Sequence, residues 1–126
     1  NDLVCMLDFA PTFLEIAGAK IPKDLQGRSI MRLLQGRSPA EWRKGVYYHY
    51  YTGYGIPEHY GVRTKTHKLL HFPSFRDDSY WELFDLTEDA DELTNVYTKA
   101  EYQDVAKTLH AMLTADEKKF AVPGKS

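Results

Sequence analysis

The stretch Y-G-V-R-T-K-T-H-K-L-L-H-F, residues 60–72, decides the fold of this chain. Apolar, aromatic and β-branched residues dominate its two ends, and the polar residues 65–67 separate them. Such a pattern predicts either two separate strands or one hairpin that turns at 65–67. In both cases a β-sheet forms the centre of the second part of the chain.

More strands are predicted on both sides of this stretch. Residues 46–51 are β-branched and aromatic, and residues 80–86 alternate in polarity, so both read as strands. Residues 73–78 are polar and turn-like, and residues 87–95 form an acidic connection that we expect to be solvated. The sequence thus predicts about four short strands.

Residues 101–118 form the clearest helix of the chain. Its apolar residues recur at helical spacing, and the opposite face is charged. They are Tyr102, Val105, Ala106, Leu109, Met112 and Leu113. A helix of this kind needs an apolar partner, which one face of an antiparallel sheet can supply. We therefore predict an α+β fold, in which a C-terminal amphipathic helix packs on a small antiparallel sheet.

The first 44 residues read as a helical segment that leads into this domain. Asp8 is predicted to cap a helix that contains Pro11 in its first turn and ends at Gly18. A short helix is predicted over residues 30–35, and the capping box S-P-A-E at 38–41 predicts one more helical turn, through Arg43. We assign residues 1–44 to the helical segment and residues 45–126 to the sheet-and-helix domain.

Composition excludes several classes of protein. The chain has 126 residues and a net charge of −2, so it lacks the electrostatic signature of a nucleic-acid-binding protein. No apolar run approaches the roughly 20 residues that span a bilayer. The single cysteine, Cys5, cannot form an internal disulfide and cannot build a thiolate metal site.

No self-sufficient active site is apparent. The sequence contains no glycine-rich phosphate loop, no HExxH motif and no nucleophile elbow. Cys5 has apolar neighbours and reads as an inert thiol. His67 and His71 stand four residues apart, but a strand would hold them far from each other, so we expect solvated histidines. We predict no catalytic residue and no metal ligand in this chain.

His59 is the strongest candidate for a binding residue. It follows a glycine-containing loop and lies beside Tyr60 at the start of a predicted strand, where a histidine can hydrogen-bond a ligand hydroxyl. The alternative is an ordinary half-buried histidine. The tyrosines crowded into residues 47–60 suit either a wet binding site or the half-buried face of a strand.

Four motifs, in order, resemble the sulfatases of the alkaline-phosphatase-like superfamily. Residues 8–18, D-F-A-P-T-F-L-E-I-A-G, resemble D-x-x-P-T-x-L-x-x-A-G, and residues 22–34 resemble the P-x-x-x-x-G-x-S-L-x-x-L-L that follows it. Residues 62–70 match the V-R-T-x-x-x-K-L-I strand pair, and residues 82–96 resemble E-L-Y-D-L-x-x-D-P-x-E-x-x-N-L, with Phe84 and Ala90 as departures. The histidine and tyrosine pattern of residues 47–72 is similar to bacterial glucosamine-6-sulfatases and mucin-desulfating sulfatases.

This resemblance implies a parent enzyme that hydrolyses sulfate esters of sulfated glycans. Its chemistry would use a calcium ion and a formylglycine made from the cysteine of C-x-P-S-R. Cys5 is followed by Met-Leu-Asp, so it is not that cysteine. Calcium and formylglycine are therefore expected in a missing N-terminal catalytic domain. Residues 1–44 would be the tail of that α/β domain, and the present chain alone should be inactive.

The resemblance also gives expectations for binding. His59 would hydrogen-bond a glycan hydroxyl, and His49 and Tyr54 would be further substrate contacts at the rim. The expected partners are the missing catalytic domain, the sulfated sugar and, through an apolar stripe of Phe9, Phe13 and Ile16, a second copy of the chain. The parent would be periplasmic, secreted or at the cell surface. The alternatives are a stand-alone carbohydrate-binding module and a purely structural module.

Overall fold

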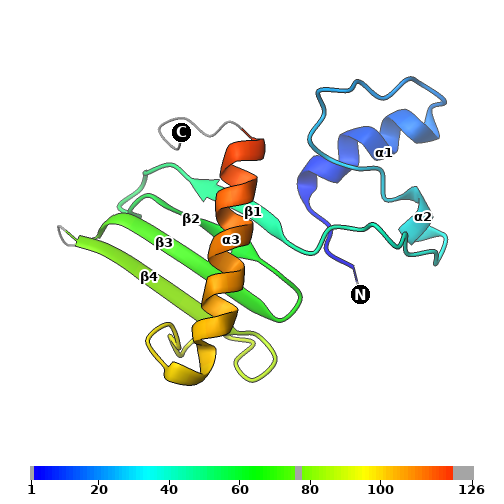
Figure 1. Ribbon diagram of the computed structural model, residues 1–126. Coiled ribbons are helices and arrows are strands. Elements are labelled where there is room, and N and C mark those ends of the chain that lie inside the picture. Colours follow the sequence, from blue (N-terminus) through cyan, green and yellow to red (C-terminus); the bar gives the residue numbers. More distant parts are fainter. Residues whose placement is uncertain (1, 76–77, 121–126) are drawn as a thin grey trace. The chain divides into compact units, whose positions relative to one another are not determined.

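The computed structural model describes residues 2–75 and 78–120. The chain divides between Lys44 and Gly45 into two compact units. The first unit is mainly short helices and loops, and the second is an antiparallel sheet with one long helix (Figure 1).

The sheet of the second unit has four strands, which lie in the order of the sequence. They are β1 (Val46–Tyr50), β2 (His59–Arg63), β3 (His67–Phe75) and β4 (Asp78–Asp85). Every neighbouring pair is antiparallel. Of the two alternatives for residues 60–72, the hairpin is correct, and the backbone N–H of Thr64 donates to the carbonyl of His67 at its turn, at 2.8 Å.

Helix α3 (Gln103–Lys119) follows a short 3-10 turn, η2 (Ala100–Tyr102), and packs across the sheet (Figure 1). Its buried residues, Ala106, Leu109 and Leu113, join the core cluster with the central strands. The sheet supplies Val62, Leu69 and Leu83, which are cross-strand partners and fully buried. Each such side chain contributes roughly 1.5–3 kcal/mol by leaving water. The predicted α+β fold with an amphipathic C-terminal helix is confirmed.

Alternation along the strands gives the sheet two distinct faces. We call the face that packs on α3 the helix face, and the opposite one the second face. Register places His49, Tyr60, His71 and Trp81 in one row on the helix face, since each is the cross-strand partner of the next. Tyr50 and His59 are likewise partners, on the second face.

The region between β3 and β4 differs from the prediction. We expected residues 73–78 to be a turn, but β3 continues to Phe75 and β4 begins at Asp78. The register shifts between Phe72 and Phe75. Pairing of β3 with β2 ends at His71, so Pro73, which lacks an N–H, removes no ladder bond on that side.

The first unit contains η1 (Met6–Asp8), α1 (Phe9–Ile16) and α2 (Met31–Leu34). Gly18 and Gly36 follow α1 and α2 with φ of +65° and +73°, and the predicted helix end at Gly18 is confirmed. The helical turn predicted through Arg43 does not form, because residues 38–43 contain no helix and only a non-helical turn, in which the N–H of Trp42 donates to the carbonyl of Pro39. Tertiary contacts account for the difference, since the Trp42 indole donates to the carbonyl of Leu3 and Arg43 binds Asp8.

The predicted capping role of Asp8 is also wrong. Its side chain is fully buried and makes no capping bond to α1. Instead the carboxylate accepts from the backbone N–H groups of Cys5 and Arg28, each at 2.9 Å, and from both terminal nitrogens of Arg43. Asp8 thus joins three separate segments of the first unit.

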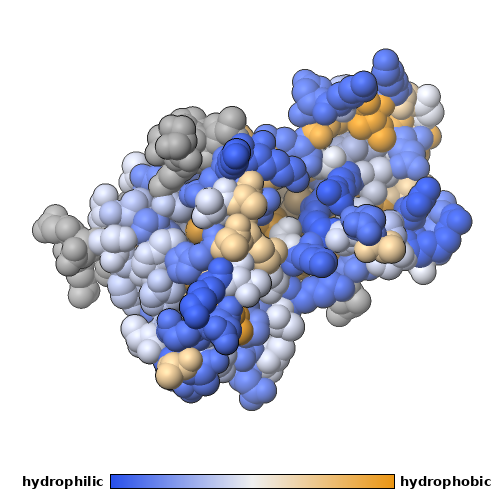
Figure 2. Space-filling model, in the orientation of Figure 1, coloured by the Kyte–Doolittle hydropathy of each residue, from blue (hydrophilic) through white to orange (hydrophobic). Residues whose placement is uncertain are grey.

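Apolar side chains reach the surface of the first unit, where orange atoms are visible in Figure 2. Phe9, Phe13 and Ile16 of α1 are 46%, 65% and 61% exposed. Across residues 2–75 and 78–120, no helix is long and apolar enough to cross a membrane.

Candidate functional site

His59 begins β2 and lies on the second face between two aromatic rings. The ring of Tyr50 stacks on one side, with centroids 5.2 Å apart and planes 19° apart. Phe72 stacks on the other side, at 5.1 Å and 29°. The imidazole is therefore held in a defined plane by its neighbours on β1 and β3.

A hydrogen bond fixes the protonation pattern of His59. Its Nδ1 lies 3.0 Å from the backbone carbonyl of Pro57. A carbonyl oxygen can only accept, so Nδ1 carries the hydrogen, and Nε2 of the neutral ring is left with a lone pair. Within the described part of the chain Nε2 has no hydrogen-bond partner. Every buried side-chain nitrogen or oxygen in that part has a partner, so the unpartnered Nε2 must be accessible to solvent. This atom can accept a hydrogen bond from a hydroxyl group.

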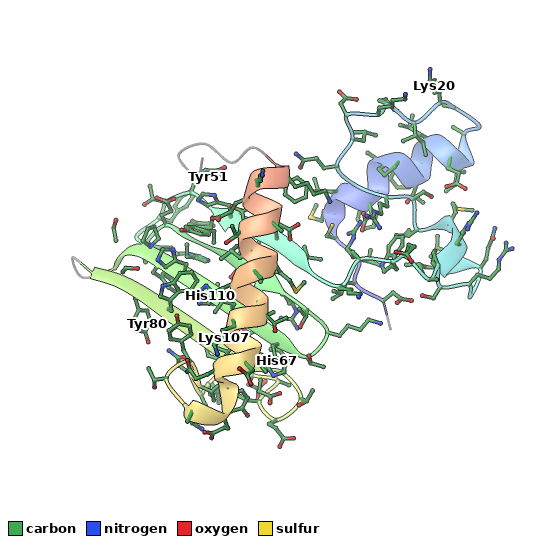
Figure 3. The ribbon with its side chains drawn as sticks, viewed as in Figure 1. Lys20, Tyr51, His67, Tyr80, Lys107 and His110 are labelled. Carbon is green, nitrogen blue, oxygen red and sulfur yellow. The ribbon has the colours of Figure 1, made fainter. Side chains whose placement is uncertain are left out.

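His49 occupies a different environment, on the helix face. Its side chain is only 7% exposed, and Nε2 lies 2.9 Å from a carboxylate oxygen of Glu58. Nδ1 lies 3.2 Å from the hydroxyl of Tyr47, and the ring of Tyr51 stacks on the imidazole at 3.9 Å. Figure 3 labels Tyr51, which follows β1 directly. Both nitrogens of His49 are thus engaged within the protein.

Tyr54 lies at the tip of the loop that joins β1 to β2. Tyr54 and Gly55 have φ of +50° and +76°, and the flanking Gly53 and Ile56 pair as an isolated bridge. The Tyr54 side chain is fully exposed. The structure therefore separates the three predicted binding residues: His59 on the second face, His49 on the helix face and Tyr54 at a loop tip.

Sequence reasoning missed the residues that surround His59. Tyr50 and Phe72 flank its ring, and Glu58 holds the end of the preceding loop. Alternation along β1 places Tyr48 and Tyr50 on one face, but the register that brings Tyr50 beside His59 comes only from the strand pairing.

Charged groups line the same second face. Glu92, in the left-handed region with φ of +57°, bridges Lys68 and Arg63, with 2.9 Å to the latter. Glu92 is therefore not the solvated acidic side chain that we expected in residues 87–95. Burial raises the pKa of Glu82 above its ordinary value, although nearby Lys68 and His59 act in the opposite direction.

Histidines on the helix face belong to an aromatic network. His71 stacks on Trp81 at 4.0 Å and bonds Ser79, at 2.7 Å. His110, labelled on α3 in Figure 3, meets Trp81 edge-on at 4.3 Å, and burial lowers its pKa. His67 lies 3.7 Å from Asp85 and is 19% exposed. The expectation that His67 and His71 are solvated is wrong, because both pack against cross-strand neighbours.

No acidic, cysteine or histidine cluster of three or more in residues 2–75 and 78–120 is arranged to hold a metal ion. The Cys5 thiol lies 2.9 Å from Nη1 of Arg43 and 3.6 Å from a carboxylate oxygen of Asp8. The residues that follow this thiol are Met-Leu-Asp, which do not fit the C-x-P-S-R motif of a formylglycine precursor.

The fold defines an α+β domain: an open antiparallel sheet, covered by a C-terminal helix and preceded by a helical segment. Residues 1–119 match the family described as "N-sulphoglucosamine sulphohydrolase, C-terminal". The chain belongs to this family of sulfatase C-terminal domains.

Several curated relatives carry sulfatase names, of which two are described here. The N-acetylglucosamine-6-O-sulfatase of Bacteroides thetaiotaomicron is 42% identical over 119 residues, which cover 90% of this chain and 21% of the relative. Arylsulfatase K of Xenopus laevis is 32% identical over 111 residues, covering 76% of this chain and 19% of the relative. The chain thus spans about a fifth of the length of these relatives.

Solved structures share this fold. A protein in complex with its substrate D-glucosamine-2-N,6-O-disulfate is 40% identical, with a TM-score of 0.84 over 94% of this chain and 24% of that protein. The phosphonate monoester hydrolase of Agrobacterium radiobacter, 22% identical, has a TM-score of 0.71 over 89% of this chain and 24% of its own, a likeness of fold alone.

Proposed function

We propose that this chain is the C-terminal part of a sulfatase that hydrolyses a sulfate ester of a sulfated glycan, with 6-O-sulfated glucosamine as the substrate class. Two findings support the class: a curated relative at 42% identity is named N-acetylglucosamine-6-O-sulfatase, and a solved structure at 40% identity holds D-glucosamine-2-N,6-O-disulfate as its substrate. The match over residues 1–119 favours this proposal over a stand-alone carbohydrate-binding module.

One observation of the structure carries the role of this chain: the lone pair on Nε2 of His59 is free, in a ring held between Tyr50 and Phe72. A sugar hydroxyl can donate a hydrogen bond to this acceptor. Tyrosine combines an apolar ring with a polar hydroxyl, which suits a site that is partly exposed to solvent. His59 is therefore the proposed contact with the glycan, and Tyr54 a second contact at the loop tip. His49, with both nitrogens engaged, has no free group to offer a sugar.

The chemical step belongs, in this proposal, to the rest of the parent. Calcium and formylglycine would likewise belong to the rest of the parent, because residues 2–75 and 78–120 group no three metal-ligating side chains and Cys5 is followed by Met-Leu-Asp. The chain contributes one wall of the substrate pocket and structural support, and it is inactive by itself. The parent works in the periplasm, at the cell surface or outside the cell.

Replacement of His59 by Ala in the full-length parent tests this role. We expect kcat/KM on a 6-O-sulfated glucosamine to fall about 2- to 12-fold, which corresponds to one lost hydrogen bond of roughly 0.5–1.5 kcal/mol. The same variant is assayed on a small aryl sulfate, which has no sugar hydroxyl to lose. An equal loss on both substrates, or no loss on either, would remove His59 from the glycan pocket.

A further inference from the structure

We propose that His49 and Glu58 form a positioning pair, which holds His59 in the tautomer that accepts a hydrogen bond from the sugar. Neither residue touches the glycan in this proposal. The inference rests on the proposed function of His59. It goes beyond that function, because two side chains opposite the second face of the sheet are assigned the control of the His59 tautomer.

The pair closes the loop between β1 and β2. His49 is the second-last residue of β1, and Glu58 directly precedes β2, so their 2.9 Å contact ties the two ends of the loop together. His49 is itself held on two further sides, by the hydroxyl of Tyr47 at 3.2 Å and the stacked ring of Tyr51 at 3.9 Å. A buried, fully engaged imidazole is a rigid anchor for the carboxylate.

Hydrogen-bond direction is consistent along this chain of contacts. The carboxylate of Glu58 accepts, so Nε2 of His49 donates to it. Nδ1 of a neutral His49 then accepts from the hydroxyl of Tyr47. His49 and His59 therefore carry their hydrogens on different nitrogens, and each pattern is set by an oxygen that can only accept.

The contact reaches His59 through the backbone. Glu58 lies between Pro57, whose carbonyl accepts from Nδ1 of His59, and His59 itself. A carboxylate fixed by His49 restricts the peptide units on both sides of Glu58, including that carbonyl. When the anchor is lost, the carbonyl can turn away and His59 can move its hydrogen to Nε2. The acceptor would then become a donor and would no longer match a sugar hydroxyl that donates.

A stabilising role alone explains the pair less well. The side chain of Glu58 is 43% exposed, and ion pairs with one partner in water contribute little to folding. The contact between His49 and Glu58 lies one residue before His59. It can therefore orient the backbone beside His59 even though it adds little to the free energy of folding.

A double-mutant cycle in the full-length parent tests the proposal. We expect Glu58→Ala to lower kcat/KM on a 6-O-sulfated glucosamine about 2- to 5-fold. This loss is smaller than that of His59→Ala, because in a fraction of the molecules Nε2 of His59 still accepts the hydrogen bond. In the His59→Ala background the same change should have no further effect. Glu58→Gln should restore the activity, since its amide oxygen still accepts from His49. Glu88→Ala, in the acidic connection, is the matched control and should leave kcat/KM unchanged.

A second measurement does not depend on turnover. Nitrogen-15 NMR of histidine side chains in the labelled parent reports which ring nitrogen carries the hydrogen. We expect His59 to be protonated at Nδ1 in the parent and in Glu58→Gln. In Glu58→Ala we expect a mixture of the Nδ1-protonated and Nε2-protonated tautomers. This measurement also decides the proposal if Glu58→Ala is poorly folded, because His49→Ala, which removes the donor to Glu58, should produce the same mixture.

The outcomes separate the two proposals. If His59→Ala leaves the glycan reaction unaffected, the proposed function of His59 fails, while the NMR result still decides the positioning role. Suppose instead that His59→Ala lowers kcat/KM as expected. If Glu58→Ala then lowers kcat/KM by the same factor in both backgrounds, or if the His59 tautomer does not change, the positioning pair is overturned and the function of His59 stands.

Discussion

At the scale of single residues, Asp8 illustrates how one buried carboxylate can organise a small helical unit. Burial by itself would raise the pKa of Asp8, but hydrogen bonds from Arg43 and from the backbone N–H groups of Arg28 and Cys5 outweigh it, so that pKa lies below its ordinary value. The sequence pattern before α1 is typical of an N-cap. It could not show that Arg43, 35 residues away, takes the side chain instead.

We expect Asp8→Asn to destabilise the chain by about 3 kcal/mol, because it leaves the largely buried guanidinium of Arg43 without its counter-charge. Urea unfolding measures this change. The same substitution at exposed Asp24 is the control and should change stability by less than about 0.5 kcal/mol. Similar decreases in the free energy of unfolding for the two variants would show that the contact between Asp8 and Arg43 does not stabilise the fold.

The lowered pKa of Asp8 also predicts a dependence on pH. Because the folded-state pKa lies below the value of about 3.9 in the unfolded chain, the contribution of Asp8 is fully present above about pH 4 and is lost as the pH falls through the folded pKa. Melting temperatures between about pH 2 and pH 6 should fall more steeply for the natural chain than for Asp8→Asn. Parallel curves would contradict this origin of acid sensitivity.

At the scale of elements, the amphipathic stripe of α3 was fully readable from the sequence, because a helix of 17 residues repeats its pattern several times. The capping box at 38–41 has no such repetition. Its local preference for a helix is overridden by the contacts of Trp42 and Arg43 with distant residues. The extension of β3 to Phe75 was missed for the opposite reason, since Pro73 is an unfavourable strand residue that becomes tolerable where β2 no longer pairs.

The close approach of β2 and β3 at Gly61 gives an element-scale prediction. A Cβ at this position would lie 2.0 Å from the carbonyl oxygen of Leu69, and only a shift of one strand could relieve that contact. We expect Gly61→Ala to destabilise the sheet by about 1–3 kcal/mol or more. Gly53→Ala is the control, because its Cβ would meet only the Tyr50 hydroxyl, at 3.5 Å. Equal melting temperatures for the two variants would refute the close approach.

At the scale of the whole molecule, the fold class could be predicted, but the assembly of a site could not. Alternation within one strand tells which of its residues share a face. It does not tell which face of the next strand they join, and that depends on register. His49 and His59 were both reasonable candidates, and the pairing of Tyr50 with His59 then sends the two imidazoles to opposite faces.

The exposed apolar face of α1 predicts the solution behaviour of the isolated chain. Phe13 is 65% and Ile16 61% exposed, and large apolar side chains exposed together on one helix face are typical of a contact surface. We expect the chain alone to self-associate, and Phe13→Ser to shift it toward the monomer in light scattering. A monomer at high concentration, with Phe13 intact, would exclude this surface as a self-contact.

The two tryptophans of the chain fall one in each unit. Trp42 binds the carbonyl of Leu3, whereas Trp81 is stacked by His71 and touched edge-on by His110. Each unit thus carries its own intrinsic fluorophore in a distinct surrounding. Replacing either indole by Phe leaves one tryptophan, so excitation that selects tryptophan over the nine tyrosines can record the melting of the helical segment and of the sheet separately, without any added label.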